Sequence, residues 1–360
     1  MSSTLQKSRT NRKLHLDFLR IIAIFMVLFN HTNQHGFVHF TVAQDSVLYP
    51  FYLFSAHLIK IAVPLFFMIS GALLLGKEES FKDLLIKRFL KYLIVLTVAS
   101  IILYVYFSLQ LYHKPMSVSD FLKGLYSGKI TLAYWYLYAY LAFILMLPLL
   151  RKLARGMADR DFKWVLLLCT LVGLLELGQY RLSQGSTVYN TNFSLFAGQN
   201  YILYPLMGYY IEHRLKAKAF RKRNLLLLWA IALGALLLSC YMTHYMCTIT
   251  NGWTEAGCQS FMNTLIFLPS IAVFYTAKLW FTRHTPGKRI SKAITTLGGL
   301  TFGIYLMEGI CRVETKHILP ILRPYVHTFP ACIIWILCAC VFGGVCIFIL
   351  KLIPGVKKWI

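Results

Sequence analysis

An apolar stretch near the beginning of the chain carries polar residues whose types and spacing suit proton transfer and anion binding. Arg20 and His31 are eleven residues apart, so on an α-helix they project within about 20° of each other and lie about 16 Å apart along the axis. Asp17 stands three residues before Arg20, where the two side chains can pair. A histidine changes charge near about pH 6.5, and a guanidinium binds phosphates and carboxylates. One helix face therefore presents a candidate base, His31, and a candidate anion site, Arg20 held by Asp17.

A simpler interpretation is a membrane helix with polar ends, in which Asp17, Arg20 and His35 lie at the headgroups. It leaves His31 unexplained, because this histidine lies fifteen residues beyond Leu16 in an otherwise apolar segment. A polar side chain at such a depth costs free energy unless it is paired or hydrated, and such residues often mark functional sites. His31 is therefore the residue of this stretch that most needs a functional explanation.

Two basic residues, Arg88 and Lys91, open the third apolar stretch of the chain, three positions apart. On an α-helix this spacing places them on one face. They are either the positive charges that ordinarily mark the cytoplasmic edge of a membrane helix or a docking point for a phosphorylated cytosolic ligand. The sequence leaves both interpretations open.

Two further sets of residues could line a substrate site. Residues 134–140 are rich in Tyr and Trp and include Tyr134 and Trp135, a composition typical of the aromatic belt at a membrane interface. Glu308 is an isolated carboxylate inside another apolar stretch, and an intramembrane carboxylate is a functional candidate. Lys60, in the second apolar stretch, is the kind of lysine that extends its ammonium to the interface.

The composition indicates which structural elements must position these residues. Of the 360 residues, 58% are hydrophobic and only 14% are charged, whereas soluble domains are about 45–50% apolar and about 25% charged. An aromatic content of 15% also excludes a disordered chain. We predict an all-α, polytopic transmembrane helical bundle of about ten spans, because a span needs about 20 apolar residues. The predicted spans are 17–36, 50–76, 88–112, 131–150, 162–181, 196–212, 224–246, 259–281, 297–312 and 328–352.

The basic residues predict the orientation of the bundle. Of 37 Lys and Arg residues, 28 fall in the two terminal segments and alternate connectors, and seven fall in the other connectors. Basic residues mark the cytoplasmic side of membrane proteins, so we expect both termini in the cytoplasm. The net charge of +24 is spread over six edges rather than one patch, which argues against a nucleic-acid partner.

These features divide the chain into a cytoplasmic N-terminal tail (1–15), a membrane domain (16–353) and a cytoplasmic C-terminal tail (354–360). Most of the nine cysteines lie in or beside spans and are interpreted as packing residues. Cys247 and Cys258 lie at the two ends of the seventh connector, where a disulfide is chemically permitted. The sequence does not decide whether this disulfide forms. No His or Cys spacing suggests a metal site.

The order of these motifs resembles the acyltransferase-3 family of integral-membrane O-acyltransferases, nearly from end to end. The matching segments are residues 16–20 with His31 eleven positions after Arg20, residues 63–71, residues 88–91, residues 134–138 with Pro148, residues 302–306, and Pro354 with Gly355. Three positions depart from the family pattern: Lys91 stands where a second Arg is usual, Tyr134 where a His is frequent, and Glu308 where a His is common.

The resemblance implies transfer of an acyl group, often acetyl, from cytosolic acyl-CoA to a hydroxyl of a cell-surface or lipid-linked glycan, in the cell membrane and without a metal. We expect His31 to act as the base, Arg20, Arg88 and Lys91 to contact CoA phosphates, Asp17 to hold Arg20, and Tyr134, Trp135 and Glu308 to line the acceptor side. Some relatives carry a fused hydrolase-like domain for which 360 residues leave no room, so we expect the membrane domain, or a partner, to complete the transfer. The alternatives are a transporter or exporter of a glycan or small polar molecule and a purely structural scaffold. The sequence does not indicate the oligomeric state.

Overall fold

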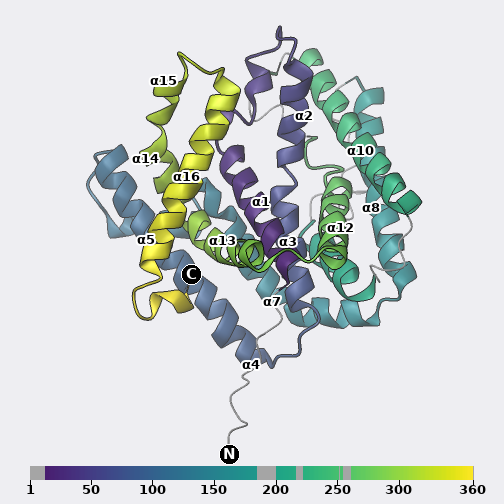
Figure 1. Cartoon of the computed structure of the whole chain (residues 1–360), viewed down its shortest axis with the longest axis horizontal. Coiled ribbons are helices and arrows are strands. Elements are labelled where there is room, and N and C mark those ends of the chain that lie inside the picture. Colours follow the sequence, from purple (N-terminus) through teal and green to yellow (C-terminus); the bar gives the residue numbers. More distant parts are fainter. Residues whose placement is uncertain (1–12, 185–199, 216–221, 251, 254–260, 360) are drawn as a thin grey trace, which may run out of the picture.

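The computed structural model describes residues 13–184, 200–215, 222–250, 252–253 and 261–359. Throughout these residues the chain forms helices and turns and no strand, so the predicted all-α class is confirmed (Figure 1). The first half contains α1 (Leu14–Asn30), η1 (Asn33–His35), η2 (His39–Thr41), α2 (Tyr49–Ile59), α3 (Ala62–Leu74), α4 (Phe81–Asp83), η3 (Leu84–Phe89), α5 (Leu90–Tyr106), η4 (Phe107–Leu111), α6 (Val118–Ser127), η5 (Leu132–Tyr134), α7 (Trp135–Gly156) and α8 (Asp159–Leu182). The second half contains α9 (Asn200–Tyr209), η7 (Tyr210–Arg214), α10 (Lys222–Ile249), α12 (Phe267–Arg283), α13 (Lys288–Leu306), α14 (Glu308–Thr315), α15 (Ile318–Leu322), α16 (Thr328–Leu350) and η9 (Val356–Lys358).

Several helices are long and apolar enough to cross a membrane. Among the described residues these are Tyr49–Leu74, Phe81–Leu111, Leu132–Gly156, Lys222–Ile249 and Thr328–Leu350. The helices α1 and α12 have 17 residues each, which is below the roughly 20 residues that span a bilayer core. The chain is thus consistent with a membrane protein, and the count of ten spans stays a prediction.

The predicted span 297–312 is not one straight helix. Helices α13 and α14 meet at 85°, and Figure 1 shows α13 almost end-on while α14 runs across the view. Met307 is the residue at the bend, where α13 ends and α14 begins. The bend makes Glu308 the first residue of a new helix rather than a residue in the middle of a span.

A second break divides the stretch 50–76 into α2 and α3 at Lys60 and Ile61. Pro64 follows four residues after Lys60. A proline has no N–H for the carbonyl four residues earlier and its ring crowds that carbonyl, so the helix is interrupted just at Lys60. The break places this lysine at a junction of two helices.

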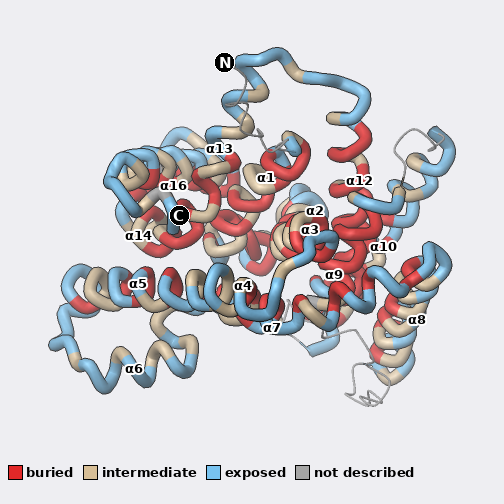
Figure 2. The backbone as a smooth tube through the Cα atoms, turned by 90° about the horizontal axis from the view of Figure 1, so that it is seen from below, coloured by how far each residue is buried: buried red, intermediate tan, exposed pale blue. Residues whose placement is uncertain are grey.

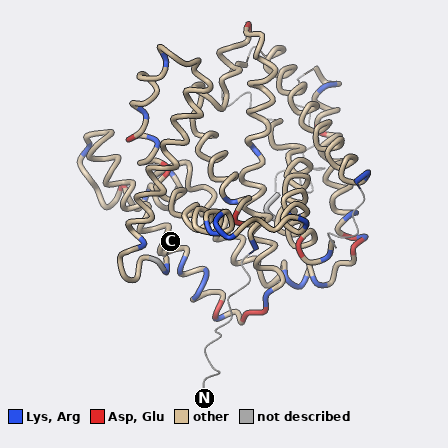
Figure 3. Tube along the Cα trace, viewed as in Figure 1, with Lys and Arg blue, Asp and Glu red and all other residues tan. Residues whose placement is uncertain are grey.

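Helix α1 lies at the centre of the bundle, in contact with α2, α3, α12, α13 and α16. Figure 2 shows the inner helices with many buried residues, whereas the peripheral α6 has none and α5 and α8 bury only some of theirs. The exposed side chains of α5, α8 and α10 include many Leu, Ile and Val residues, as expected for helices that face lipid. Most of the Lys and Arg positions lie in the lower half of the view in Figure 3. This asymmetry agrees with the predicted orientation, which itself stays a prediction.

Cys247 is buried and bonded in a disulfide. Cys258, the partner that the sequence suggests, lies outside the described residues. The other seven cysteines, from Cys169 to Cys346, are free thiols, most of them buried in the bundle. This matches their interpretation as packing residues.

Helices α3 and α9 approach each other closely in the core, and this approach depends on two glycines. A Cβ atom at Gly71 would lie 2.0 Å from the carbonyl oxygen of Pro205, and one at Gly208 would lie 1.9 Å from that of Met68. Both obstacles are backbone atoms, which cannot rotate away as a side chain can. Small residues at such crossings let helix backbones pack directly together in membrane proteins.

We expect Gly71→Ala and Gly208→Ala each to destabilise the protein by about 2 kcal/mol or more, since the added methyl group forces the two backbones apart. Gly234→Ala on α10 is the matched control, because a Cβ there meets no atom within 4 Å. Thermal unfolding in detergent should show a lowered Tm for the first two variants and an unchanged or higher Tm for the third. Equal Tm values for all three would contradict this account of the α3–α9 contact.

Candidate active site

A cavity of about 750 Å³ lies between α1, the α2–α3 junction, α5, α7 and α13. Among the described residues, its lining includes three cationic side chains, Arg20, Lys60 and Lys91, and no Asp or Glu. Arg20 projects from the early part of α1 and His31 from its end, so the cavity follows α1 for about 16 Å. A cavity with these cations at its wall favours an anionic ligand.

His31 is paired with Glu308 across the bend between α13 and α14. Its Nδ1 atom lies 3.1 Å from Glu308 Oε1, an ion-pair distance without the alignment of a linear hydrogen bond. Glu308 is only 1% exposed, and the same oxygen accepts a 2.8 Å hydrogen bond from Arg312 Nε. The carboxylate thus stands behind the imidazole ring, and His31 itself lines the cavity.

Next to His31, Asn30 also lines the cavity. Its Oδ1 atom is buried and has no hydrogen-bond partner among the described residues. A buried amide oxygen without a partner costs free energy, so such an atom at a cavity wall points to a ligand that donates a hydrogen bond. Lys60 lies in the same region, and its Nζ is 4.7 Å from the ring centroid of Phe37. The backbone N–H of Phe37 donates a hydrogen bond to Thr32 Oγ1, next to His31 in the chain.

At the other end of the cavity, Arg20 Nη1 donates a 2.7 Å hydrogen bond to Asp17 Oδ1, the pair that their spacing allows. Asp17 is 1% exposed and packs against Gly298 of α13, where a Cβ would lie 2.7 Å from Asp17 Cβ. Glycine at position 298 therefore leaves room for the buried carboxylate. Asp17 holds the Arg20 guanidinium at the cavity wall.

Arg88 and Lys91 have different partners in the structure, and only Lys91 lines the cavity. Arg88 Nε donates a 2.8 Å hydrogen bond to Glu79, its terminal nitrogen contacts the same carboxylate, and Arg88 is not among the residues that line the cavity. Lys91 lines the cavity and donates a 2.5 Å hydrogen bond to the carbonyl of Lys358. Arg88 belongs to the π-helical turn η3 and Lys91 to α5. Because a π turn holds more residues than an α turn, a spacing of three no longer puts both on one face.

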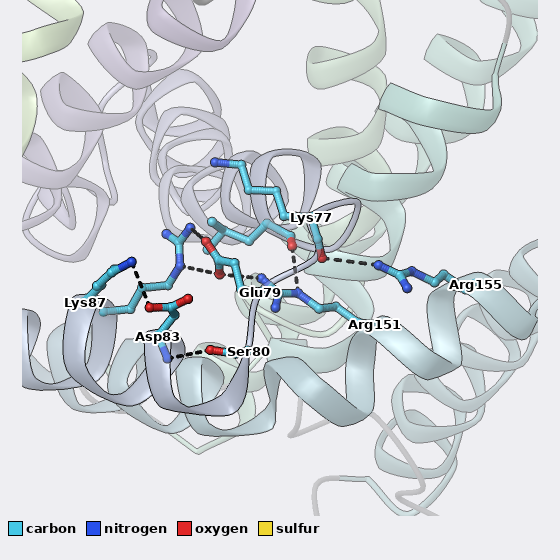
Figure 4. A network of polar contacts seen from close by, with 9 residues as sticks. Lys77, Glu79, Ser80, Asp83, Lys87, Arg151 and Arg155 are labelled. Carbon is cyan, nitrogen blue, oxygen red and sulfur yellow. Dashed lines mark hydrogen bonds and ion pairs between the residues drawn. The ribbon is translucent and has the colours of Figure 1, made fainter.

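Glu79 is the centre of a polar network that fastens the connector after α3 to its neighbours (Figure 4). Besides Arg88, it accepts a 2.9 Å hydrogen bond from Arg151 of α7, whose Nε also bonds to the carbonyl of Leu74. Arg155 adds a bond to the carbonyl of Lys77. This network ties α3, η3 and α7 together, so the structure gives Arg88 a packing role. Its contact with donor phosphates stays a prediction.

Of the remaining predicted site residues, one lines the cavity and two lie behind its lining. Trp135 lines the cavity together with Tyr136 and Tyr140. Tyr134 is buried beside it, and its hydroxyl donates a 2.5 Å hydrogen bond to the carbonyl of Leu306. That bond fastens η5 to the end of α13, one residue before the bend. Neither Tyr134 nor Glu308 is among the lining residues.

Three features of the site were not foreseen from the sequence. The pairing of Glu308 with His31 joins residues 277 positions apart, and no local spacing indicates it. Lys60 was interpreted as an interfacial lysine, and the only available signal was Pro64, which predicts a break at this point. Asn30 immediately precedes His31, and the only signal in the sequence was its polar amide at the end of an apolar stretch. Among the described residues, no group of three or more His, Cys, Asp or Glu could hold a metal ion.

We expect Glu79 to contribute to stability in a way that depends on pH. The guanidinium of Arg88, helped by that of Arg151, outweighs burial and lowers the pKa of Glu79 from 4.5 to about 2. A lowered pKa stabilises the folded state above pH 4.5, and this contribution disappears as the pH falls from 4.5 toward about 2. At pH 7, Glu79→Gln should therefore destabilise the protein by about 1–3 kcal/mol, and the difference from wild type should shrink below about pH 4.

Glu78→Gln is the control for this prediction, because the Glu78 side chain is 85% exposed and pairs with Arg155 at the surface. An exposed pair contributes about 0–1 kcal/mol. Thermal unfolding in detergent at several pH values measures both variants. If Glu79→Gln is no more destabilising than Glu78→Gln at pH 7, the network does not fasten the connector as described.

Comparison with known proteins identifies the family of the chain. A family model described as an acyltransferase domain matches residues 14–353, a range that contains the cavity wall and the residues that support it, apart from the segment around Trp359. No curated protein and no solved structure matches the chain. Because the matched range is nearly the whole chain, the protein belongs to the acyltransferase-3 family.

Proposed function

We propose that the protein transfers an acyl group, acetyl in the simplest case, from cytosolic acyl-CoA to a hydroxyl of a cell-surface or lipid-linked glycan at the cell membrane. The observation that carries this proposal is the cavity, which joins a carboxylate-backed histidine at one end to an arginine–aspartate pair at the other. Acyl transfer needs a base for the attacking hydroxyl. An acyl-CoA donor also needs cations for its phosphates.

The donor occupies the Arg20 end in this proposal. Arg20 and Lys91 both line the cavity, and an ammonium or guanidinium forms charge-assisted hydrogen bonds with phosphate. Arg20 lies about 16 Å along α1 from His31. An extended pantetheine arm is long enough to cover this distance, so phosphates at Arg20 place the thioester near His31.

His31 carries the chemistry in this proposal. Its Nδ1 faces Glu308, which leaves Nε2 to take the proton from the acceptor hydroxyl. The hydroxyl oxygen forms a bond to the thioester carbonyl carbon, the carbon–sulfur bond breaks, and His31 returns the proton to the departing thiolate. The products are an ester on the acceptor and free CoA. Glu308 keeps the imidazole oriented and stabilises its positive charge while it holds the proton.

The acceptor enters beside His31 from the other direction. The unpartnered Asn30 Oδ1 is suited to accept a hydrogen bond from a second hydroxyl of a sugar. Trp135 and Tyr136 present aromatic rings to the cavity, and aromatic faces pack well against the apolar face of a sugar ring. Tyr134 and Glu308 support this wall from behind rather than contact the acceptor.

His31→Ala should lower kcat for transfer from acetyl-CoA by about 10²–10⁴-fold, the usual effect of removing a general base. Glu308→Gln should lower kcat to a smaller degree with little change in KM, because the amide keeps the shape but not the charge. The control is His35→Ala, since His35 bonds to Arg323 and is not among the lining residues. A folded His31→Ala variant with wild-type turnover would refute the assignment of the base.

Arg20→Ala should chiefly weaken donor binding, by about 10-fold or more, since a charge-assisted hydrogen bond to phosphate is lost. Arg20→Lys keeps the positive charge without the planar fork and should weaken binding less. Titration of the purified protein with CoA measures both affinities. Unchanged CoA affinity in a folded Arg20→Ala variant would remove Arg20 from the donor site.

A further inference from the structure

The segment after α16 returns to the wall of the cavity. Helix α16 ends at Leu350, and Gly355 has a φ of 91°, a left-handed conformation that glycine adopts without strain. The chain then forms the short turn η9 and reaches Trp359, which lines the cavity. In Figure 1 the C-terminal end lies beside α5 and α13.

Two lysines hold this segment in place, one at each end. Lys351 Nζ donates a 2.5 Å hydrogen bond to the carbonyl of Gly299 on α13, and Lys91 Nζ on α5 donates a 2.5 Å hydrogen bond to the carbonyl of Lys358. Gly299 and Lys91 themselves line the cavity. The segment is therefore tied to two sides of the same opening, and Trp359 follows directly after the second tie.

These ties place Trp359 at the Arg20 end of the cavity rather than at the His31 end. Gly299 is next to Gly298, which packs against Asp17, the partner of Arg20. An indole ring thus shares one end of the cavity with a guanidinium and an ammonium. Trp359 as a whole residue is 40% exposed, so part of its surface is accessible to a ligand.

We propose that Trp359 is a donor-specificity residue that stacks on the purine ring of acyl-CoA. This inference rests on the proposed function, because it assigns a place to the nucleotide of that donor. The donor carries a flat purine ring and phosphates, and the site offers a flat indole ring beside two cations. Any nucleic-acid base can stack on an aromatic side chain, because every base has a π face. An ammonium has three N–H donors, so Lys91 can keep its bond to Lys358 and still contact a phosphate. The 351–359 segment is then one wall of the nucleotide site.

The test compares donors with and without the nucleotide. Purified protein is titrated with CoA and with pantetheine, and transfer is measured from acetyl-CoA and from acetyl-pantetheine. Trp359→Ala should weaken CoA binding by about tenfold or more, within the range found for a base stacked on an aromatic side chain, and should leave pantetheine binding and acetyl-pantetheine turnover unchanged. Trp359→Phe keeps a flat ring and should retain most of the CoA affinity.

Trp280→Ala is the matched control. Trp280 is a half-exposed tryptophan of α12 that packs against Phe281 and His284, and it is not among the lining residues. The inference is overturned if Trp359→Ala binds CoA as wild type does, if it loses CoA and pantetheine equally, or if the wild type binds no CoA. Because binding is measured without turnover, a wild type that binds CoA but transfers no acyl group would refute the proposed function while the Trp359 comparison still decides this inference.

Discussion

The contact between His31 and Glu308 depends on a constraint that governs the whole bundle: a charged group in an apolar interior must have a partner. Glu308 is almost completely buried, and its carboxylate lies between His31, which directly follows α1, and Arg312 of α14. This arrangement is possible because the chain turns by 85° at Met307. A straight helix would carry Glu308 and Arg312 onward in the direction of α13, away from the end of α1.

The same constraint explains how the cavity obtains its charge. Asp17 and Glu308 are both buried behind the wall, where they hold Arg20 and His31, and the lining residues themselves include cations but no carboxylate. The negative charges thus position the reactive side chains without facing a ligand. Such a wall favours an anionic ligand, because its cations attract negative charge and the nearby carboxylates are already paired with Arg20 and His31.

Much of the fold follows from features that can be seen in the sequence. The apolar composition predicts a helical membrane bundle because only helices and closed barrels satisfy their backbone hydrogen bonds in lipid. The spacing of Asp17, Arg20 and His31 predicts the pairing and shared face that the structure shows, because helical periodicity is a local property. Arg88 and Lys91 show where this reasoning fails. They belong to a π turn and an α-helix in succession. Arg88 is bonded to Glu79 in the preceding connector, and Lys91 is bonded to the carbonyl of Lys358 from a distant part of the chain.

The sequence by itself determined the class of fold and the candidate residues in and just after α1, since composition and helical spacing depend only on near neighbours. The family followed from the resemblance of motifs whose order can also be read in the sequence. The tertiary structure decided which charges meet. In the folded chain Glu308 is paired with His31, Arg88 is hydrogen-bonded to Glu79, and Trp359 lines the cavity. Each of these depends on a bend, a turn or a helix contact between distant segments, and the free energy that selects it comes from burying and pairing groups that no local pattern connects.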